Sequence, residues 1–365
     1  MKLYNCSLNS IKEVFETKRI VFFGCGSWLK QIEYTEFEEL KDQFAYVIDN
    51  APCGDVVISG KCLNVYPVDK LKEEQECIVV LTSPIYQYEM FCQLEEMKLN
   101  DGIRCYSLPF MQHVTRDSWE DEWLKEVTNV TEKRIPKTIH GFWFSGDEKP
   151  DLYKKCVDSW YKNLPDYEII EWNKNNYDWH KHPFLERAIE LEAWAFASDY
   201  ARLDVLHQYG GLYLDMDVEV FQPFDPLLGN SAILSFSNHI LIDLAVMGAE
   251  KNNGLVGKML RVYDGISVPE DRKGFSKWFQ PTLMRKTLAE AGIKMNGRGQ
   301  LLKEGTAVFP KDFFMPLDFV LFQQYDKTEN TYCVHYDNFG WSFSGESKRE
   351  KKINDNRKLW SRIEN

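Results

Sequence analysis

Short runs of apolar and β-branched residues recur along the first third of the chain, and polar, helix-compatible segments separate them. A strand of a parallel sheet is buried on both faces, so a continuous apolar run is typical of it. The alternation therefore predicts a small, doubly wound α/β sheet within residues 1–115. The expected strands are Arg19–Gly26, Ala45–Asn50, Cys77–Ser83 and Gly102–Leu108.

The first of these runs ends in Gly24-Cys25-Gly26, and the second carries Asp49 near its end. Both features belong to a dinucleotide-binding fingerprint, because amides of a glycine turn can approach a pyrophosphate and the carboxylate can bind ribose hydroxyls. Leu29 stands where the third glycine of the fingerprint belongs. We therefore favour a structural Rossmann-like domain without a cofactor over an NAD-dependent oxidoreductase.

A second pattern begins after a stretch of mixed charge and tryptophan, residues 116–133, which suits a helical connector. A β-type run follows, with Pro136 near its start and Ser145-Gly146 at its end. Ligands of α/β folds gather at the carboxyl ends of strands, so Trp143 near the end of this run could stack on a nucleotide base. A tryptophan of the core is the alternative.

A long helical pattern then covers Glu186–Gln208 and stops at Gly210-Gly211, which we expect to form a left-handed cap. Asp199 and Arg202 are three residues apart and share one helix face. They could form an ordinary ion pair or grip one polar ligand together. Their apolar surroundings make unsatisfied polar groups costly, which leaves both interpretations open.

The segment Leu212–Phe221 predicts a strand and its end. Asp215 and Asp217 are two positions apart, so we expect both carboxylates on the same side. Two like charges at the end of a buried strand repel each other, and a bound divalent cation offsets that repulsion. Mg²⁺ or Mn²⁺ prefers oxygen ligands and would bridge to a diphosphate. A D-x-D triplet arises easily by chance, so the order of the motifs carries more weight.

Three segments in this order resemble glycosyltransferase family 32, the D-x-D sugar transferases that include bacterial capsule enzymes and are related to the large clostridial glucosylating toxins. They are IPKTIHGFWFSG from Ile135, SDYARLDVLHQYGGLYLDMDVEV from Ser198 and TYCVHYDNFGWS from Thr331. The resemblance implies a GT-A fold over residues 134–345, a nucleotide-sugar donor, a divalent metal ion, and transfer with retention of the anomeric configuration.

The resemblance also implies roles for individual residues. Trp143 would stack on uracil, Asp199 and Arg202 would hold the donor sugar, and Asp215 would contact ribose and sugar hydroxyls. Asp217 and His335 would bind the metal. The implied catalytic residues are Asp199, Arg202, Asp215 and Asp217, and the implied donor-binding residues are Trp143, His140, Asp199, Arg202, Asp215 and Trp341.

The sequence departs from the family at two places. His335-Tyr336 and Gly340-Trp341 stand where relatives tend to read His-His and Ser-Trp, and Gln280-Pro281 stands where many have Gly-Pro before the acceptor-side helix. The second departure prevents transfer of the acceptor geometry. The missing serine leaves the last metal or phosphate ligand open among Asp337, Asn338 and Ser342.

The resemblance favours a retaining hexosyltransferase that uses UDP-galactose or UDP-glucose and a saccharide or lipid-linked saccharide acceptor, in bacterial surface polysaccharide synthesis. A phosphatase of the haloacid-dehalogenase type is one alternative, with Asp215 as nucleophile and Asp217 as general acid. Such a strand normally opens its domain, whereas a long helix precedes it here. A non-catalytic sugar-binding protein that kept the fold is the other alternative.

The composition of the chain indicates which classes of partner it can bind and where in the cell we expect it. The chain of 365 residues has 44 Lys and Arg against 56 Asp and Glu, a formal net charge of −12, which disfavours nucleic acid as a partner. The first 26 residues show no apolar h-region before a small-residue cleavage site, so we expect no secretion leader. No apolar run approaches about 20 residues, and the nine cysteines, without a C-x-x-C pair, suit reduced thiols. We therefore expect a cytoplasmic protein.

The last segment, residues 346–365, is rich in Lys and Arg with spaced apolar residues, and we expect a basic helix there. One interpretation is peripheral contact with the anionic inner face of a membrane, near a lipid-linked acceptor. The other is a solvated face of a helix that packs on its own domain.

Overall fold

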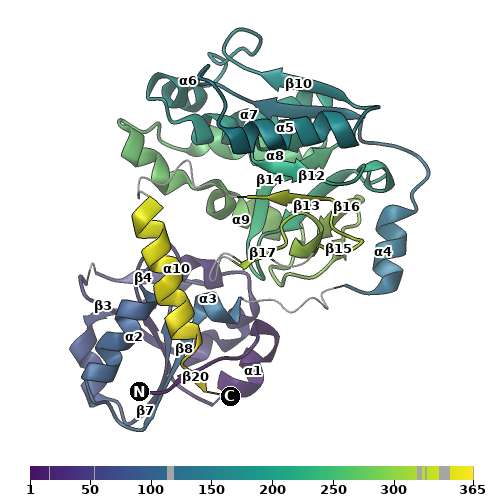
Figure 1. Cartoon of the computed structure of the whole chain (residues 1–365). Helices are drawn as coiled ribbons and strands as arrows, with labels where there is room; N and C mark the ends of the chain where they lie inside the picture. Colours follow the sequence, from purple (N-terminus) through teal and green to yellow (C-terminus); the bar gives the residue numbers. More distant parts are fainter. Residues whose placement is uncertain are drawn as a thin grey trace.

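The computed structural model describes residues 1–15, 17–52, 54–112, 119–318, 323–324, 327–336 and 346–364. In these ranges the chain builds two α/β units, each around a seven-stranded sheet, which confirms the predicted α/β class. The first unit lies at the bottom of Figure 1 in purple and blue, and the second lies above it in teal and green.

The first sheet consists of parallel strand pairs in the order β20-β1-β8-β7-β2-β3-β6. The run β6-β3-β2-β7-β8 has the strand order of a Rossmann-type half sheet extended to a fifth strand, with the reversal between β2 and β7. All four predicted strands are present, as β2 (Ile20–Phe23), β3 (Phe44–Asp49), β7 (Glu76–Leu81) and β8 (Gly102–Ser107). The other three are β1 (Leu3–Tyr4), β6 (Val65–Pro67) and β20 (Ile363–Glu364).

The segment between β3 and β7 is not helical as the alternation predicted. It forms a hairpin, β4 (Val56–Ile58) with β5 (Lys61–Leu63), before β6 and a 3-10 helix. Ser59 and Gly60 have φ of 49° and 76°, the positive pair that a two-residue hairpin turn requires. The helical elements of this unit are η1 (Leu8–Ser10), α1 (Ile11–Phe15), η2 (Leu29–Ile32), η3 (Glu36–Gln43), η4 (Val68–Glu73), α2 (Gln87–Glu96) and α3 (Leu108–Met111).

The second sheet is mixed, in the order β10-β9-β11-β14-β13-β16-β15. β10, β9 and β11 are mutually parallel, and β14 runs antiparallel to both β11 and β13. Beside this sheet, β12 pairs with β19. The bounds are β9 (Thr138–Phe142), β10 (Glu168–Trp172), β11 (Gly211–Leu214), β12 (Val218–Val220), β13 (Ala232–Phe236), β14 (Ile242–Ala249), β15 (Gln300–Leu301), β16 (Thr306–Phe309), β17 (Leu317–Asp318), β18 (Gln323–Gln324) and β19 (Cys333–His335).

Helices cover both faces of the second sheet. Alternate residues of β11 face two separate cores, Tyr213 toward α6, α7, α8 and α9, and Leu212 and Leu214 toward α4 and α5. The helical elements are α4 (Asp121–Thr128), α5 (Asp151–Asn163), α6 (Pro183–Glu190), α7 (Trp194–Tyr209), η5 (Asp225–Leu227), α8 (Gly254–Val262), η6 (Tyr263–Gly265), η7 (Arg272–Trp278), α9 (Gln280–Glu290) and η8 (Lys311–Phe313).

The single long helix predicted over Glu186–Gln208 is wrong. The pattern is divided into α6 and α7, because the chain turns at Glu192, whose φ is 54°. The amide of Ala193 donates back to the carbonyl of Ala188 and closes α6. Apolar spacing continues through this turn because both helices bury their faces in the same core, so spacing alone hides the break.

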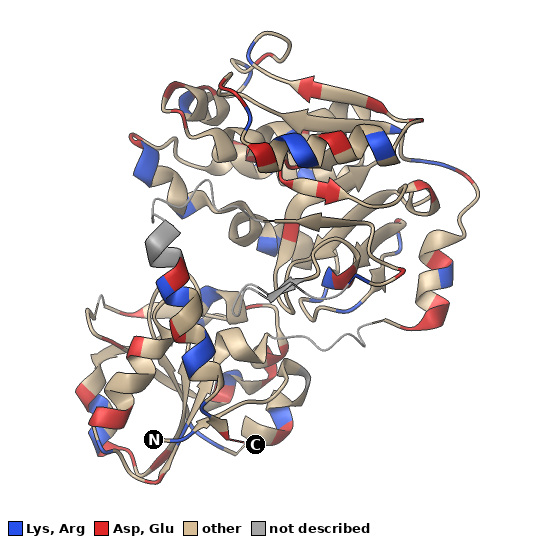
Figure 2. Ribbon diagram, in the orientation of Figure 1, with Lys and Arg blue, Asp and Glu red and all other residues tan. Residues whose placement is uncertain are grey.

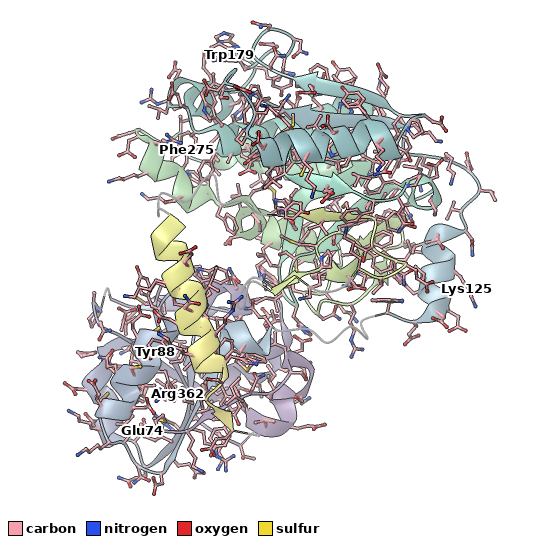
Figure 3. The ribbon with its side chains drawn as sticks, viewed as in Figure 1. Glu74, Tyr88, Lys125, Trp179, Phe275 and Arg362 are labelled. Carbon is pink, nitrogen blue, oxygen red and sulfur yellow. The ribbon has the colours of Figure 1, made fainter. Side chains whose placement is uncertain are left out.

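The C-terminal segment returns to the first unit. α10 (Glu346–Trp360) lies over that unit in yellow in Figure 1, and β20 pairs with β1 at the sheet edge. Leu359 is fully buried in the core of the first unit, and the ring of Trp360 packs edge-on against Phe110. Lys358 lies above the ring of Tyr88, which Figure 3 labels beside α10.

The tail therefore uses its apolar side chains inside the protein, as in the second interpretation above. Its basic residues pair with acidic residues of α2, as Lys352 does with Glu89 and Arg362 with Glu95. Figure 2 shows the blue segments of Lys and Arg along α10 and the red segments of Asp and Glu on α2 beside it. The membrane-contact hypothesis has no support from this packing. Among the described residues, no helix combines the length and apolar character that crossing a membrane requires.

Candidate functional site

The D-x-D turn lies between β11 and β12, at the carboxyl edge that β9 and β11 share. The amide of Asp215 donates to the carbonyl of Ala245 on β14, which fixes the start of the turn. α7 reaches β11 through Gly210 and Gly211, whose φ values are 71° and 110°. The positive φ values explain why glycine stands at both positions, but the ψ of −174° at Gly210 lies outside the left-handed helical region, so the predicted left-handed cap is not formed there.

Arg202 on α7 joins the helix to the D-x-D turn. Its Nη2 lies 3.0 Å from Asp199 Oδ1 and 3.2 Å from Asp215 Oδ1, and its Nη1 donates to the carbonyl of Leu244. The guanidinium lies 4.6 Å from the centroid of the Tyr213 ring, and the Tyr213 hydroxyl donates to Asp215. Asp199 and Arg202 thus form the ion pair that the helix spacing allows, and the pair extends to the D-x-D turn.

One guanidinium here faces two carboxylates. Burial raises the pKa of Asp199 to about 7, against the lowering effect of Arg202 and with further raising by Asp215 and Asp243. Burial also raises the pKa of Asp215, although Arg202 opposes that shift. Burial lowers the pKa of Arg202, but the neighbouring carboxylates outweigh it and hold the net pKa above its ordinary value. The cluster therefore keeps its arginine charged and favours an added positive charge beside Asp215.

His335 lies opposite the D-x-D turn because β19 pairs with β12, with His335 in register with Val218. Its Nε2 lies 3.4 Å from Asp217 Oδ1 and 4.0 Å from Asp215 Oδ2. Its Nδ1 lies 3.0 Å from Asp243 Oδ2. Burial lowers the pKa of His335, but the carboxylates of Asp217 and Asp243 outweigh it, so the net pKa lies well above its ordinary value.

Three of these side chains fit a divalent cation. Asp215, Asp217 and His335 each offer one ligand atom, and the three atoms lie within 4.8 Å of one another. Two carboxylate oxygens and an imidazole nitrogen suit Mn²⁺, and the oxygens suit Mg²⁺. The structure thus brings together the predicted metal ligands Asp217 and His335 and adds Asp215 to them.

Asp243 and Tyr213 were missed by the sequence analysis. Asp243 is a carboxylate inside the apolar run of β14, and Tyr213 precedes the D-x-D turn by two positions. A charged residue within an apolar strand is a signal that could have found Asp243, since such a group is costly without a partner. Its partner, His335, lies 92 positions away and only the fold reveals it.

Trp143 follows β9 directly and lies at the same sheet edge as Asp215, since β9 and β11 are parallel. The ring is half-buried, its Nε1 donates to the carbonyl of Asp147, and it packs 5.5 Å from the ring of Tyr153. The ring thus lies at the sheet edge that carries the D-x-D turn, while part of it covers the core.

His140 is placed differently from the expectation. Its side chain is fully buried, Nε2 contacts the carbonyl of Gly210 at 2.8 Å, and Nδ1 accepts from Trp172 Nε1 at 3.0 Å. Both ring nitrogens are therefore engaged with the protein, and burial lowers the pKa of the ring. The structure gives His140 a role in holding β9, β10 and the end of α7 together, instead of a contact with the donor.

Tyr336, where relatives tend to have a second histidine, is directed toward α5. Its hydroxyl donates to Glu219, its ring lies under Lys155, and its amide donates to the carbonyl of Asp217. Tyr336 directly follows β19, and its side chain thus faces surroundings different from those of His335. Trp341 and the candidate ligands Asp337, Asn338 and Ser342 lie outside the described residues.

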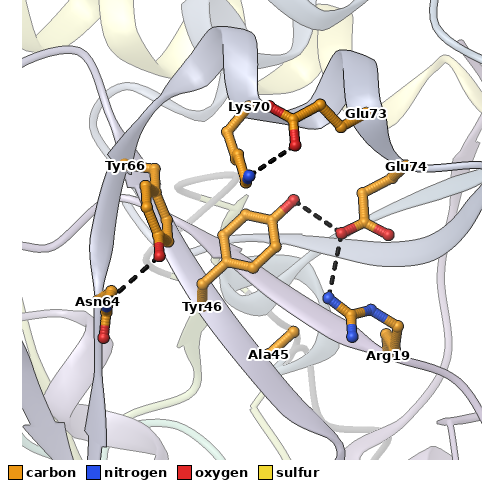
Figure 4. A pocket seen from close by; sticks show the side chains of 8 residues that line it. All are labelled: Arg19, Ala45, Tyr46, Asn64, Tyr66, Lys70, Glu73 and Glu74. Atoms are coloured by element: carbon orange, nitrogen blue, oxygen red, sulfur yellow. Dashed lines mark hydrogen bonds and ion pairs between the residues drawn. The ribbon is translucent and has the colours of Figure 1, made fainter.

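The first unit contains a cavity of about 430 Å³, shown in Figure 4. Its ionised groups pair with one another, Arg19 with Glu74 and Lys70 with Glu73, and the Tyr46 hydroxyl donates to Glu74. The cavity lies near the amino ends of β2 and β3, away from the glycine turn.

At the glycine turn, the carboxylate of Asp49 is already engaged. Its Oδ2 accepts from the amide of Cys25 and its Oδ1 accepts from the amide of Ala51, both at 2.9 Å. The turn amide that would face a pyrophosphate in a dinucleotide-binding domain is thus satisfied from within the chain.

Residues 150–234 match the family described as the glycosyltransferase sugar-binding region containing the DXD motif. The matched segment contains Asp199, Arg202, Asp215 and Asp217, whereas Asp243 and His335 lie beyond it.

Curated relatives come from two yeasts. The chain is 28% identical to inositol phosphoceramide mannosyltransferase 3 of Schizosaccharomyces pombe, over 39% of this chain and 41% of the relative. It is 30% identical to inositol phosphoceramide mannosyltransferase 2 of the same organism, over 46% of this chain and 56% of the relative. It is 29% identical to mannosyl phosphorylinositol ceramide synthase SUR1 of Saccharomyces cerevisiae, over 43% of each. The chain thus spans less than two thirds of the length of these relatives.

Two solved structures are similar at low scores. The PaToxG glycosyltransferase aligns with a TM-score of 0.34 and 16% identity, over 46% of this chain and 73% of that protein. A glycosyltransferase involved in the glycosylation of the major capsid of PBCV-1 aligns with a TM-score of 0.33 and 13% identity, over 60% of this chain and 98% of that protein.

Proposed function

We propose that this chain is a metal-dependent glycosyltransferase that moves a hexose from a nucleotide-sugar donor to an acceptor, and that its second unit has a GT-A-type fold. The observation that carries the proposal is the continuous cluster from Asp199 through Arg202 and Asp215 to Asp217 and His335. The match of residues 150–234 to the DXD sugar-binding family supports it.

Each group in the cluster has a chemical task in such a reaction. A divalent cation, when bound, would stabilise the negative charge that develops on the leaving diphosphate. Asp215, Asp217 and His335 would hold that cation. Asp199 and Arg202 would fix the donor sugar, since a rigid, buried ion pair loses little freedom when it binds hydroxyls. Trp143 would stack on the base at the neighbouring strand end.

The donor is open between two groups of sugars. The resemblance described above points to UDP-glucose or UDP-galactose, whereas the yeast relatives are named mannosyltransferases and point to a nucleotide-linked mannose. Two acceptors are candidates. The resemblance points to a saccharide, such as an intermediate of bacterial surface polysaccharide, and the names of the yeast relatives point to an inositol-phosphate lipid headgroup. Retention of the anomeric configuration belongs to the same proposal, and NMR of the product tests it.

The first test is release of nucleoside diphosphate from a panel of UDP- and GDP-sugars, with Mn²⁺ present or chelated. We expect one donor to be turned over with Mn²⁺ and not with chelator. Asp217→Asn should abolish this turnover, while Asp158→Asn, an exposed aspartate of α5, should leave it unchanged. Failure of every donor with every acceptor class, by a folded protein, would overturn the proposal.

A further inference from the structure

Asp243 lies next to the proposed metal ligands without being one of them. It stands near the start of β14, the strand that runs antiparallel to β11. Ala245, two residues after Asp243 on the same strand, accepts a hydrogen bond from the amide of Asp215. Among the described residues, the group of donor atoms close enough to share an ion consists of Asp215, Asp217 and His335. The position of Asp243 behind His335 therefore needs a separate explanation.

Both oxygens of the Asp243 carboxylate are engaged. Oδ1 accepts from the amide of Ala245 at 3.0 Å, and Oδ2 lies 3.0 Å from Nδ1 of His335. The backbone bond fixes the carboxylate, so Oδ2 presents an acceptor in one direction. An acceptor at that place requires a proton on Nδ1.

The other side of the His335 ring faces the D-x-D turn. Its Nε2 lies nearest to Asp217 Oδ1, and the residue is only 8% exposed, which leaves the ring little room to turn. A neutral histidine that keeps its proton on Nδ1 has a lone pair on Nε2. Metal-bound histidines are commonly oriented by a carboxylate on the far nitrogen.

We propose that Asp243 is a positioning residue that holds His335 with its proton on Nδ1 and directs Nε2 toward a divalent cation between Asp215 and Asp217. This inference rests on the metal dependence in the proposed function. It extends the site beyond the residues of the D-x-D segment and gives β14 a role in building it.

The substitution Asp243→Asn tests the inference with little change in size. Asparagine has only one side-chain oxygen, and the amide of Ala245, which donates to Oδ1 of Asp243, would keep that oxygen as its acceptor. The NH₂ group would then face His335 Nδ1 and could only donate, so the proton of a neutral ring would move to Nε2 and block it. We expect the affinity for Mn²⁺ alone, measured by electron paramagnetic resonance, to fall about 10- to 100-fold.

Two controls separate this mechanism from general damage. Asp204→Asn also removes a buried carboxylate, one bonded to Tyr177, Lys181 and Gln208, and should leave Mn²⁺ affinity unchanged. In the background His335→Gln, Asp243→Asn should change the affinity by less than about two-fold, since residues that act through one another do not add. Circular dichroism and thermal unfolding confirm that each variant is folded.

Nitrogen NMR of histidine-labelled protein with diamagnetic Mg²⁺ gives a readout that is independent of activity. The His335 signals, assigned by their loss in His335→Gln, should show a protonated Nδ1 in the wild type and a protonated Nε2 in Asp243→Asn. Unchanged Mn²⁺ affinity in Asp243→Asn, an equal loss in the His335→Gln background, or a wild type that binds no Mn²⁺ would overturn the inference. Tight Mn²⁺ binding with no sugar transfer would overturn only the proposed function.

Discussion

Arg285 on α9 donates two hydrogen bonds to the backbone carbonyl of Glu33 in the first unit, across 252 positions of sequence. The same guanidinium donates to the carbonyls of Gln31 and Ile240. Arg285 is 4% exposed, and burial lowers its pKa to about 10. Ile240, three residues before Asp243, packs into the core of the first unit. The two units therefore share a buried contact that reaches the strand of the candidate site.

Arg285→Met keeps most of the apolar stem and removes the donors from these carbonyls. Because buried carbonyls without partners are costly, we expect the free energy of unfolding to fall by about 2–4 kcal/mol. Urea unfolding measures this change. The matched control is Lys286→Met, at an exposed neighbour on the same helix, with an expected change within about 0.5 kcal/mol. Equal stability of both variants would contradict a structural role for the contact.

The C-terminal helix offers a second test of how the units are built. Leu359 is fully buried in the first unit, so Leu359→Ala should lower the free energy of unfolding by about 2–4 kcal/mol. Lys351→Ala, at an exposed position of the same helix, should change it by less than about 0.5 kcal/mol. If Leu359→Ala proved neutral and deletion of residues 346–365 abolished binding to anionic vesicles, the tail would be a membrane contact instead.

The sequence predicted the central strands of the first unit because β2, β3 and β7 are buried and almost wholly apolar. It could not predict β1 and β20, which are two residues each and owe their pairing to the return of the tail. The same limit applies to the break between α6 and α7. Both helices pack into one core, so the apolar spacing continues across the break and does not reveal it.

The residues of the candidate site also differ in whether the sequence could predict them. Local spacing placed Asp199 with Arg202 on one face of a helix, and the ion pair between them is present. The family resemblance, not the spacing, supplied His335, and the structure places it beside Asp217. Asp243 does carry a local signal, a carboxylate within an apolar strand, but its contact with His335 joins two strands distant in sequence and no local pattern contains that contact. His140 was wrongly grouped with the ligand-facing residues, because its motif does not reveal the two bonds that bury it.

Asp199 should leave a signature in the pH dependence of stability. Its pKa is about 7 in the folded protein because burial outweighs Arg202, against 3.8 as the ordinary value that the unfolded chain retains. The folded state thus binds a proton that the unfolded state has lost, and stability falls as pH rises from about 4 to about 7. Asp199→Asn lacks this component.

The measurement is chemical unfolding with chelator present at pH 5 and pH 8. The stability of the wild type relative to Asp199→Asn should be lower at pH 8 than at pH 5. Parallel profiles for the two proteins would mean that Arg202 keeps Asp199 ionised throughout. The pKa of Asp199 in the folded protein would then not be raised above its ordinary value.

The junction between α7 and β11 gives the last prediction. Gly211 has a φ of 110°, and a Cβ there would lie 2.6 Å from the carbonyl oxygen of Thr138 and 3.0 Å from Nε2 of His140. Gly211→Ala should therefore lower the free energy of unfolding by about 2–4 kcal/mol, through backbone strain and the displacement of β9. It should also lower the proposed transferase activity, because the junction sets the distance between Arg202 and Asp215.

Gly254→Ala is the matched control for this variant. Gly254 begins α8, has no positive φ, and a Cβ there meets no atom within 4 Å. Alanine favours a helix over glycine, so we expect a neutral or slightly stabilising effect of up to about 1 kcal/mol. Urea unfolding of the three proteins decides the matter. A Gly211→Ala protein as stable as the wild type would show that β9 and α7 can separate without cost, and that this junction does not fix the site.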